Sequence, residues 1–183
     1  MPDPVSPLKG ARFDGFATVR EVGPFGMITL RAKPGTPGLD AAIGAACGTG
    51  VPAPRRIEFA GDRACGWMSP DEYLLLLPHA GLGAALDELG RALAGQHHLA
   101  VDVSDARAVF RIEGARADQV LRKLTPADID ALAPGEIRRS RLAQIAAAFW
   151  ARDSGFTVVT FRSVAGYAMD LLSHAAMTGS ALD

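Results

Sequence analysis

The sequence predicts an α+β fold made of two similar halves, each with the element order ββαββα. Runs rich in β-branched residues alternate with stretches whose apolar residues recur at helical spacing. Most runs end at glycine or proline, of which the chain has 20 and 12. Because the same order occurs over about residues 12–95 and 98–178, we expect residues 1–183 to form a single compact body of pseudo-repeat halves, with antiparallel or mixed sheets covered by helices.

The first half begins with a predicted hairpin. Its strands are Thr18–Val22 and Met27–Leu30, and the intervening Gly23-Pro24-Phe25-Gly26 is a typical turn sequence. The other elements of this half end at turn residues: a helix over 39–46 that stops at glycines 48 and 50, strands over 56–59 and 73–77, and a helix over 82–93 that stops at Gly95.

The second half begins in the same way. Leu99, Val101 and Val103 alternate with other residues, and a turn at Ser104-Asp105 leads to a return strand over 109–112, which predicts a second hairpin. The remaining elements are a helix over 115–124, a strand over 140–151, a strand over 156–161 and a helix over 164–175.

The segment 140–151 allows two interpretations. Leu142, Ile145 and Phe149 have helical spacing, whereas the segment at the same place in the first half, 56–59, is strand-like. A shift of 83 residues supports that comparison, because it places Trp67 on Trp150 and Arg55-Arg56 on Arg138-Arg139. We therefore predict a strand buried on both faces, with a helix as the alternative.

Composition excludes several classes of protein. The 19 basic and 20 acidic residues give a net charge of −1, without the strongly basic face of a nucleic-acid-binding protein. The first seven residues lack the pattern of a secretory signal, and the uncharged stretches are too short to cross a bilayer. Cys47 and Cys65 form no CxxC motif. We expect a soluble cytoplasmic protein that binds no membrane.

We assign no catalytic, cofactor-binding or metal-ligating residue from the sequence. The histidines at 79, 97, 98 and 174 show no metal-ligand spacing, and both cysteines suit a small core residue better than a nucleophile. Gly44 to Gly50 resembles a phosphate loop but lacks the Gly-Lys-Ser/Thr that would follow one, so a helix end is the better interpretation.

The other polar candidates also have structural explanations. Asp71-Glu72, Asp102 and Asp105 lie at predicted turns, where aspartate commonly bonds its own backbone. The arginine pairs at 55–56 and 138–139 could bind an anion but suit solvated strand ends. Trp67 and Trp150 suit a shared core role, with association hot spots as the alternative.

Several segments carry a family resemblance. The stretch from Ile112 to Ile129, with Gly114, a predicted helix and Leu124-Thr125-Pro126-Ala127-Asp128, resembles the folate-binding fold of the aminomethyltransferase family. Thr125 would cap the short turn that carries Asp128. The segments 67–78, 101–110 and 140–146 are more similar to the gamma subunits of heterotetrameric sarcosine oxidases, and the resemblance extends from about residue 8 to 177.

This resemblance implies a non-catalytic subunit that docks on the alpha subunit and assembles with beta and delta. Such complexes oxidise sarcosine to glycine and hydrogen peroxide, with the one-carbon unit passed to tetrahydrofolate as 5,10-methylenetetrahydrofolate. It further implies that FAD, FMN, NAD, tetrahydrofolate and zinc belong to the other subunits and that this chain holds none. A stand-alone folate-binding one-carbon transfer protein is the alternative, and an interaction module with the same fold but another partner is a third.

Overall fold

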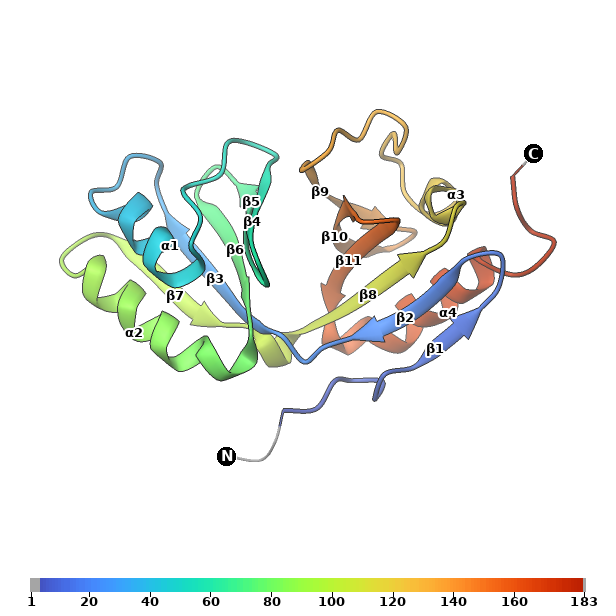
Figure 1. Ribbon diagram of the computed structural model, residues 1–183, viewed down its shortest axis with the longest axis horizontal. Coiled ribbons are helices and arrows are strands. Elements are labelled where there is room, and N and C mark those ends of the chain that lie inside the picture. Colours follow the sequence, from blue (N-terminus) through green and yellow to red (C-terminus); the bar gives the residue numbers. More distant parts are fainter. Residues whose placement is uncertain (1–3, 183) are drawn as a thin grey trace. The chain divides into compact units, whose positions relative to one another are not determined.

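The computed structural model describes residues 4–182, so residues 1–3 of the amino-terminal segment considered above lie outside the described part. Within that part the fold is α+β, with two antiparallel sheets and four α-helices (Figure 1). The strands are β1 Arg12–Asp14, β2 Thr18–Val22, β3 Gly26–Ala32, β4 Ile57–Ala60, β5 Arg63–Ser69, β6 Glu72–Leu77, β7 His98–Asp102, β8 Arg107–Glu113, β9 Ile137–Leu142, β10 Ile145–Arg152 and β11 Gly155–Phe161. The helices are α1 Leu39–Cys47, α2 Leu82–Ala92, α3 Ala117–Arg122 and α4 Ala165–Ala175.

The chain forms two units. Of the described residues, the first contains 4–24 and 105–182, and the second contains Phe25–Ser104. Within the described residues, the sheet of the first unit has the order β1-β2-β8-β11-β10-β9, and that of the second has the order β4-β5-β6-β3-β7. These units do not coincide with the predicted halves 12–95 and 98–178.

Both predicted hairpins are wrong, although their strands are present. β2 pairs with β8 and β3 pairs with β6 and β7, so neither β2–β3 nor β7–β8 is a pair. The supposed turns at 23–26 and 104–105 are the places where the chain passes from one unit to the other. In each half, therefore, the first strand belongs to one unit and the remaining elements belong to the other.

The two halves repeat the same order of elements, with one strand more than the sequence predicted. Each half reads ββαβββα, from β2 to α2 and from β7 to α4. Adding 83 to the bounds of α2, Leu82–Ala92, gives those of α4, Ala165–Ala175. The extra strand in the first half is β5, which lies between the predicted strands 56–59 and 73–77.

The segment 140–151 is extended, as predicted, but contains a turn. β9 ends at Leu142 and β10 begins at Ile145, and the two strands pair antiparallel. Ala143 between them has φ 47°, a conformation that residues with a Cβ seldom adopt. Burial on both faces is confirmed only for Ala147–Trp150, because Ile145 and Ala146 are not buried.

Each sheet has helices on one face. In the first unit, α3 and α4 pack with Val120 and Leu172 on the side of the sheet that carries Phe110 and Phe149. In the second, α1 and α2 pack with Ile43 and Leu89 on the side that carries Leu30, Tyr73 and Leu75. The alternation of side chains along each strand therefore turns every second residue toward the helices and leaves the others on the opposite face.

The carboxyl-terminal end of α1 shows how the local sequence determines where a helix stops. The helix ends at Cys47, and Gly48 follows with φ 73° and donates its N–H to the carbonyl oxygen of Gly44 at 2.8 Å. Glycine adopts this left-handed conformation without steric cost, so it is a favourable residue after a helix. The predicted stop at Gly48 is thus confirmed.

Candidate functional site

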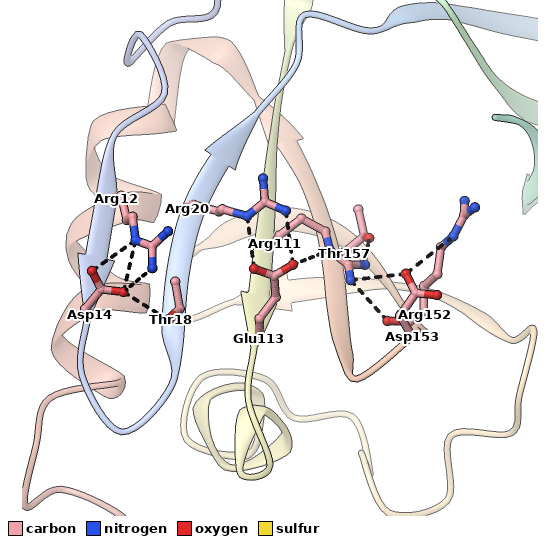
Figure 2. A network of polar contacts seen from close by, with 9 residues as sticks. All are labelled: Arg12, Asp14, Thr18, Arg20, Arg111, Glu113, Arg152, Asp153 and Thr157. Atoms are coloured by element: carbon pink, nitrogen blue, oxygen red, sulfur yellow. Dashed lines mark hydrogen bonds and ion pairs between the residues drawn. The ribbon is translucent and has the colours of Figure 1, made fainter.

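Polar side chains gather on the face of the six-stranded sheet that points away from α3 and α4 (Figure 2). On β8, Phe110 belongs to the helix-covered core, so Arg111 and Glu113 point to the opposite face. The strand register places Arg111 beside Arg20 of β2 and Thr157 of β11. Three strands that are distant in sequence thus bring their polar residues together.

Glu113 and Arg20 form the strongest pair of this network. Nε and Nη2 of Arg20 donate to Oε2 and Oε1 of Glu113, each at 3.0 Å, a bidentate geometry. The hydrogen bonds from Arg20 lower the pKa of Glu113, and the attraction of Arg111 lowers it further. The same bonds raise the pKa of Arg20. Glu113 is therefore an anion at neutral pH and is unsuited to proton transfer there.

Arg111 connects Glu113 to the turn between β10 and β11. Its Nη1 donates to Oγ1 of Thr157 at 2.8 Å, and its Nη2 donates to the carbonyl oxygen of Arg152 at 3.2 Å. Nη2 also lies 3.6 Å from Oδ2 of Asp153. Only 12% of the Arg111 side chain is exposed. A guanidinium that is nearly buried needs such partners, and Arg111 finds them on β11, at the turn between β10 and β11, and on its own strand.

A second, more exposed cluster lies at the edge of the same sheet. On β1, Nε of Arg12 donates to both carboxylate oxygens of Asp14, each at 3.0 Å. Thr18 of β2 donates its hydroxyl to Oδ1 of Asp14 at 3.0 Å. These hydrogen bonds lower the pKa of Asp14, with the Arg12 bond as the largest cause. The side chains of Arg12 and Asp14 are each 60% exposed, so this pair contributes less to stability than the Arg20–Glu113 pair.

The network is suited to holding strands together, not to acid–base catalysis near neutral pH. Its carboxylates are paired with arginines, and the pKa values of Asp14 and Glu113 are shifted away from neutrality. The contacts connect β1, β2, β8 and β11, which come from residues 12 to 161 of the chain. They therefore help to fix the strand order of this sheet.

The histidines and cysteines take no part in the described contacts of this network, which join arginines, carboxylates and threonines. Across residues 4–182, no group of three or more His, Cys, Asp or Glu side chains could hold a metal ion. Cys47 and Cys65 are buried free thiols in the second unit, so their prediction as core residues is confirmed. Burial raises the pKa of Cys47 to about 11 and raises that of Cys65 as well, which makes both thiols poor nucleophiles.

The acidic candidates have local partners. Oδ1 of Asp102 accepts from the backbone N–H of Ser104 at 2.8 Å and from its hydroxyl at 2.6 Å, as the turn interpretation predicts. Asp71 instead accepts from Arg31 and from the hydroxyl of Ser69. Oγ1 of Thr125 accepts from the N–H of Ala127 at 3.3 Å, which confirms the predicted cap.

Arg138 of the second arginine pair and the two tryptophans have structural contacts. Arg138 donates to Glu136 at 2.5 Å at the start of β9. Trp67 packs against the core of the second unit, and Trp150 of β10 is only 2% exposed. The core interpretation of the tryptophans is therefore favoured over exposed hot spots.

Arg20, Arg111 and Glu113 were missed from the sequence. On β8 the signal was the alternation of charged and apolar residues, with Arg111 and Glu113 on either side of the buried Ile112. On β2 the only signal was Arg20 next to the buried Val19. That pattern places each charge on one sheet face. It does not say which strands lie beside each other, and the network depends on that pairing.

The sequence matches the family model described as the sarcosine oxidase gamma subunit family over residues 31–177. The chain belongs to the sarcosine oxidase gamma subunit family. The gamma subunit of an Arthrobacter species is 38% identical over 141 residues, which cover 74% of this chain and 68% of that protein. The gamma subunit of Corynebacterium sp. strain U-96 is 43% identical over 115 residues, 61% of this chain and 54% of that protein. The second alignment thus spans about half of that relative's length.

Solved structures show the same fold. A chain of the heterotetrameric sarcosine oxidase from Corynebacterium sp. U-96, in complex with pyrrole 2-carboxylate, matches this gamma subunit family member with a TM-score of 0.80 and 31% identity, over 90% of this chain and 87% of that one. Aminomethyltransferase T of the glycine cleavage system from Bartonella henselae matches with a TM-score of 0.61 and 12% identity, over 86% of this chain and 46% of that one. The second likeness concerns the fold alone.

No helix within residues 4–182 is both long and apolar enough to span a membrane.

Proposed function

We propose that this chain is the structural gamma subunit of a heterotetrameric sarcosine oxidase, assembled with alpha, beta and delta subunits. The observation that carries the proposal is the match to a chain of the Corynebacterium enzyme, which covers 90% of this chain and 87% of that one. Family membership over residues 31–177 supports it. The complex would oxidise sarcosine to glycine and hydrogen peroxide and pass the one-carbon unit to tetrahydrofolate.

Within that complex the chain's role is to dock against the alpha subunit, without a catalytic step of its own. The network around Glu113 supports a structural role, because its carboxylates are paired with arginines and the lowered pKa of Glu113 does not suit proton transfer near neutral pH. FAD, FMN, NAD, tetrahydrofolate and zinc are then bound by the other subunits, as the family resemblance implies.

Co-expression tests the proposal directly. The four subunits are produced together with a tag on beta, and the purified complex is sized and assayed for sarcosine-dependent peroxide formation. We expect this chain to co-purify in equal amount with the others. A chain that never co-migrates with the tagged complex would refute the proposal.

Titration calorimetry of the isolated chain separates this function from folate binding. We expect no heat with tetrahydrofolate, because the ligand's site lies on another subunit. Saturable binding at a 1:1 ratio would favour the stand-alone folate-binding alternative, for which the aminomethyltransferase-like fold is the only support.

A further inference from the structure

Strand β7 (His98–Asp102) carries two exposed apolar side chains at the edge of the five-stranded sheet. Within residues 4–182, the order of this sheet ends at β7, which pairs with β3 on its other side. Leu99 is 55% exposed and Val101 is 41% exposed. Register places them beside Arg31 and Thr29 of β3, on the face opposite the helix-covered core.

The other terminal strands of the two sheets are protected against pairing, whereas β7 is not. β1 and β4 have only three and four residues, and β9 carries arginines at 138, 139 and 141. Short length and positive charge are the usual means by which proteins prevent another strand from adding to an edge. β7 has five residues and neither lysine nor arginine.

The backbone of β7 also points the right way to accept another strand. The N–H of Val103, just after β7, donates to the carbonyl oxygen of Met27 at 2.8 Å. In an antiparallel pair such contacts recur at every second residue, so Leu99 and Val101 also direct their backbone groups toward β3. The N–H and C=O groups of His98, Ala100 and Asp102 consequently point toward the open edge.

We propose that the edge of β7 binds an extended segment of another subunit, which adds a sixth strand to this sheet. This inference rests on the proposed function, because it names the surface used for assembly. The segment supplies backbone groups to Ala100 and its neighbours and places apolar side chains at alternate positions against Leu99 and Val101. A basic side chain at its end complements the exposed carboxylate of Asp102.

A second copy of this chain fits the edge less well. A stable two-copy interface buries about 1,200 Å² or more in total. Five residues with two exposed apolar side chains fall short of that area when they are the main contact. The same strand is adequate as one element of a larger interface with another subunit.

Two substitutions test the edge in the co-expressed complex. Ala100→Pro removes an outward-facing N–H and keeps the backbone contacts with β3. An edge strand tolerates proline at such a position, because the lost N–H pairs with no strand of its own sheet. Val101→Lys places a charge on the apolar pair. Each is expected to lower recovery of the chain with tagged beta by at least about tenfold. Tyr167→Lys, on α4 and 45% exposed in the wild type, is the matched control and is expected to co-purify normally.

Hydrogen exchange on the wild-type proteins provides a second measurement. It uses no substituted chain, so misfolding of a variant cannot account for its result. The outward-facing amides of His98, Ala100 and Asp102 are expected to exchange at least about tenfold more slowly in the complex than in the isolated chain. Unchanged exchange there, or normal co-purification of folded Ala100→Pro and Val101→Lys chains, would overturn the proposal while the assembly itself remains established.

Failure of the wild-type chain to co-purify would instead refute the proposed function. An isolated chain that is dimeric until Val101→Lys is introduced would assign the edge to a second copy and also overturn the proposal.

Discussion

Arg20 and Glu113 form a bidentate ion pair between β2 and β8, with both hydrogen bonds at 3.0 Å, although the two residues are 93 positions apart in the sequence. The pair joins the first described strands of the chain to the middle of the six-stranded sheet. Because Glu113 also lies 3.7 Å from Nε of the nearly buried Arg111, its removal affects two guanidinium groups. A substitution of Glu113 therefore tests the contribution of the network to stability.

Glu113→Gln is expected to lower the free energy of unfolding by about 1 kcal/mol, a modest value because a third or more of each side chain of the Arg20–Glu113 pair is exposed. Urea unfolding at neutral pH measures it. Asp14→Asn is the matched control, since that carboxylate is 60% exposed in its own arginine pair and its loss should leave the midpoint unchanged. Equal stabilities of the wild type and Glu113→Gln would contradict the role given to the network.

The contribution of Glu113 depends on pH in a definite direction. Its hydrogen bonds to Arg20 lower the pKa in the folded state below the ordinary value of 4.5. The unfolded chain therefore binds the proton more readily, so the stabilisation is complete above about pH 4.5 and disappears as the pH falls through the folded-state pKa. The stability difference between wild type and Glu113→Gln should thus shrink between pH 5 and pH 3. A difference that grows on acidification would contradict this assignment.

The sequence predicted the strands better than it predicted their partners. The alternating residues of 18–22 and 27–30 identify strands, and the Gly-Pro sequence between them suggests a hairpin. Pairing is decided by contacts distant in sequence: β2 lies between β1 and β8, and β3 lies between β6 and β7. No local pattern carries that information, so both hairpins were mispredicted.

The turn between β9 and β10 and the polar network show the same limit. Ala143 adopts a positive φ although no glycine or asparagine marks the turn, so 140–151 was expected as one strand. The alternation along β8 places Arg111 and Glu113 on one face, yet their partners Arg20 and Thr157 come from β2 and β11. Without the strand order, these four residues could not be recognised as one cluster.

Glu21 is expected to hold the amino-terminal segment in place. This carboxylate is only 4% exposed and accepts from the hydroxyl of Ser6 and from the backbone N–H groups of Leu8 and Gly10, at 2.9 to 3.1 Å. Glu21→Gln replaces one acceptor oxygen with a donor and should cost about 1–2 kcal/mol. Faster hydrogen exchange at Leu8 and Gly10 is the diagnostic signal, and Ser6→Ala, which removes one bond, should give a smaller effect. Unchanged exchange in Glu21→Gln would argue against this contact.

The two thiols are expected to react slowly in the folded chain. With a pKa of about 11, Cys47 is on the order of one part in a thousand thiolate at pH 8, and its buried position limits access further. A thiol-specific disulfide reagent should label neither cysteine within minutes in buffer and both in concentrated urea. Cys47→Ala and Cys65→Ala assign any residual reaction. Rapid labelling of the native chain would show that the core of the second unit opens readily.

Gly155, at the start of β11, tests the register of the sheet that carries the network. A Cβ built there would lie 2.0 Å from the carbonyl oxygen of Ile112 on β8, so alanine can be accommodated only if backbone moves. Gly155→Ala should therefore lower the free energy of unfolding by about 2 kcal/mol or more. It should also weaken the contacts between Arg111 and Thr157, because these residues pair across the same two strands.

Gly90→Ala is the control for the backbone effect of the substitution. Gly90 lies inside α2, and a Cβ there would meet nothing within 4 Å. Because alanine favours the helix over glycine, this change should raise stability by about 0.5–1 kcal/mol. Thermal and urea unfolding of both variants measure the expected loss of stability in Gly155→Ala and the expected gain in Gly90→Ala. A Gly155→Ala chain as stable as the wild type would mean that β8 and β11 do not approach in this register, and the Arg111–Thr157 contact would then need another explanation.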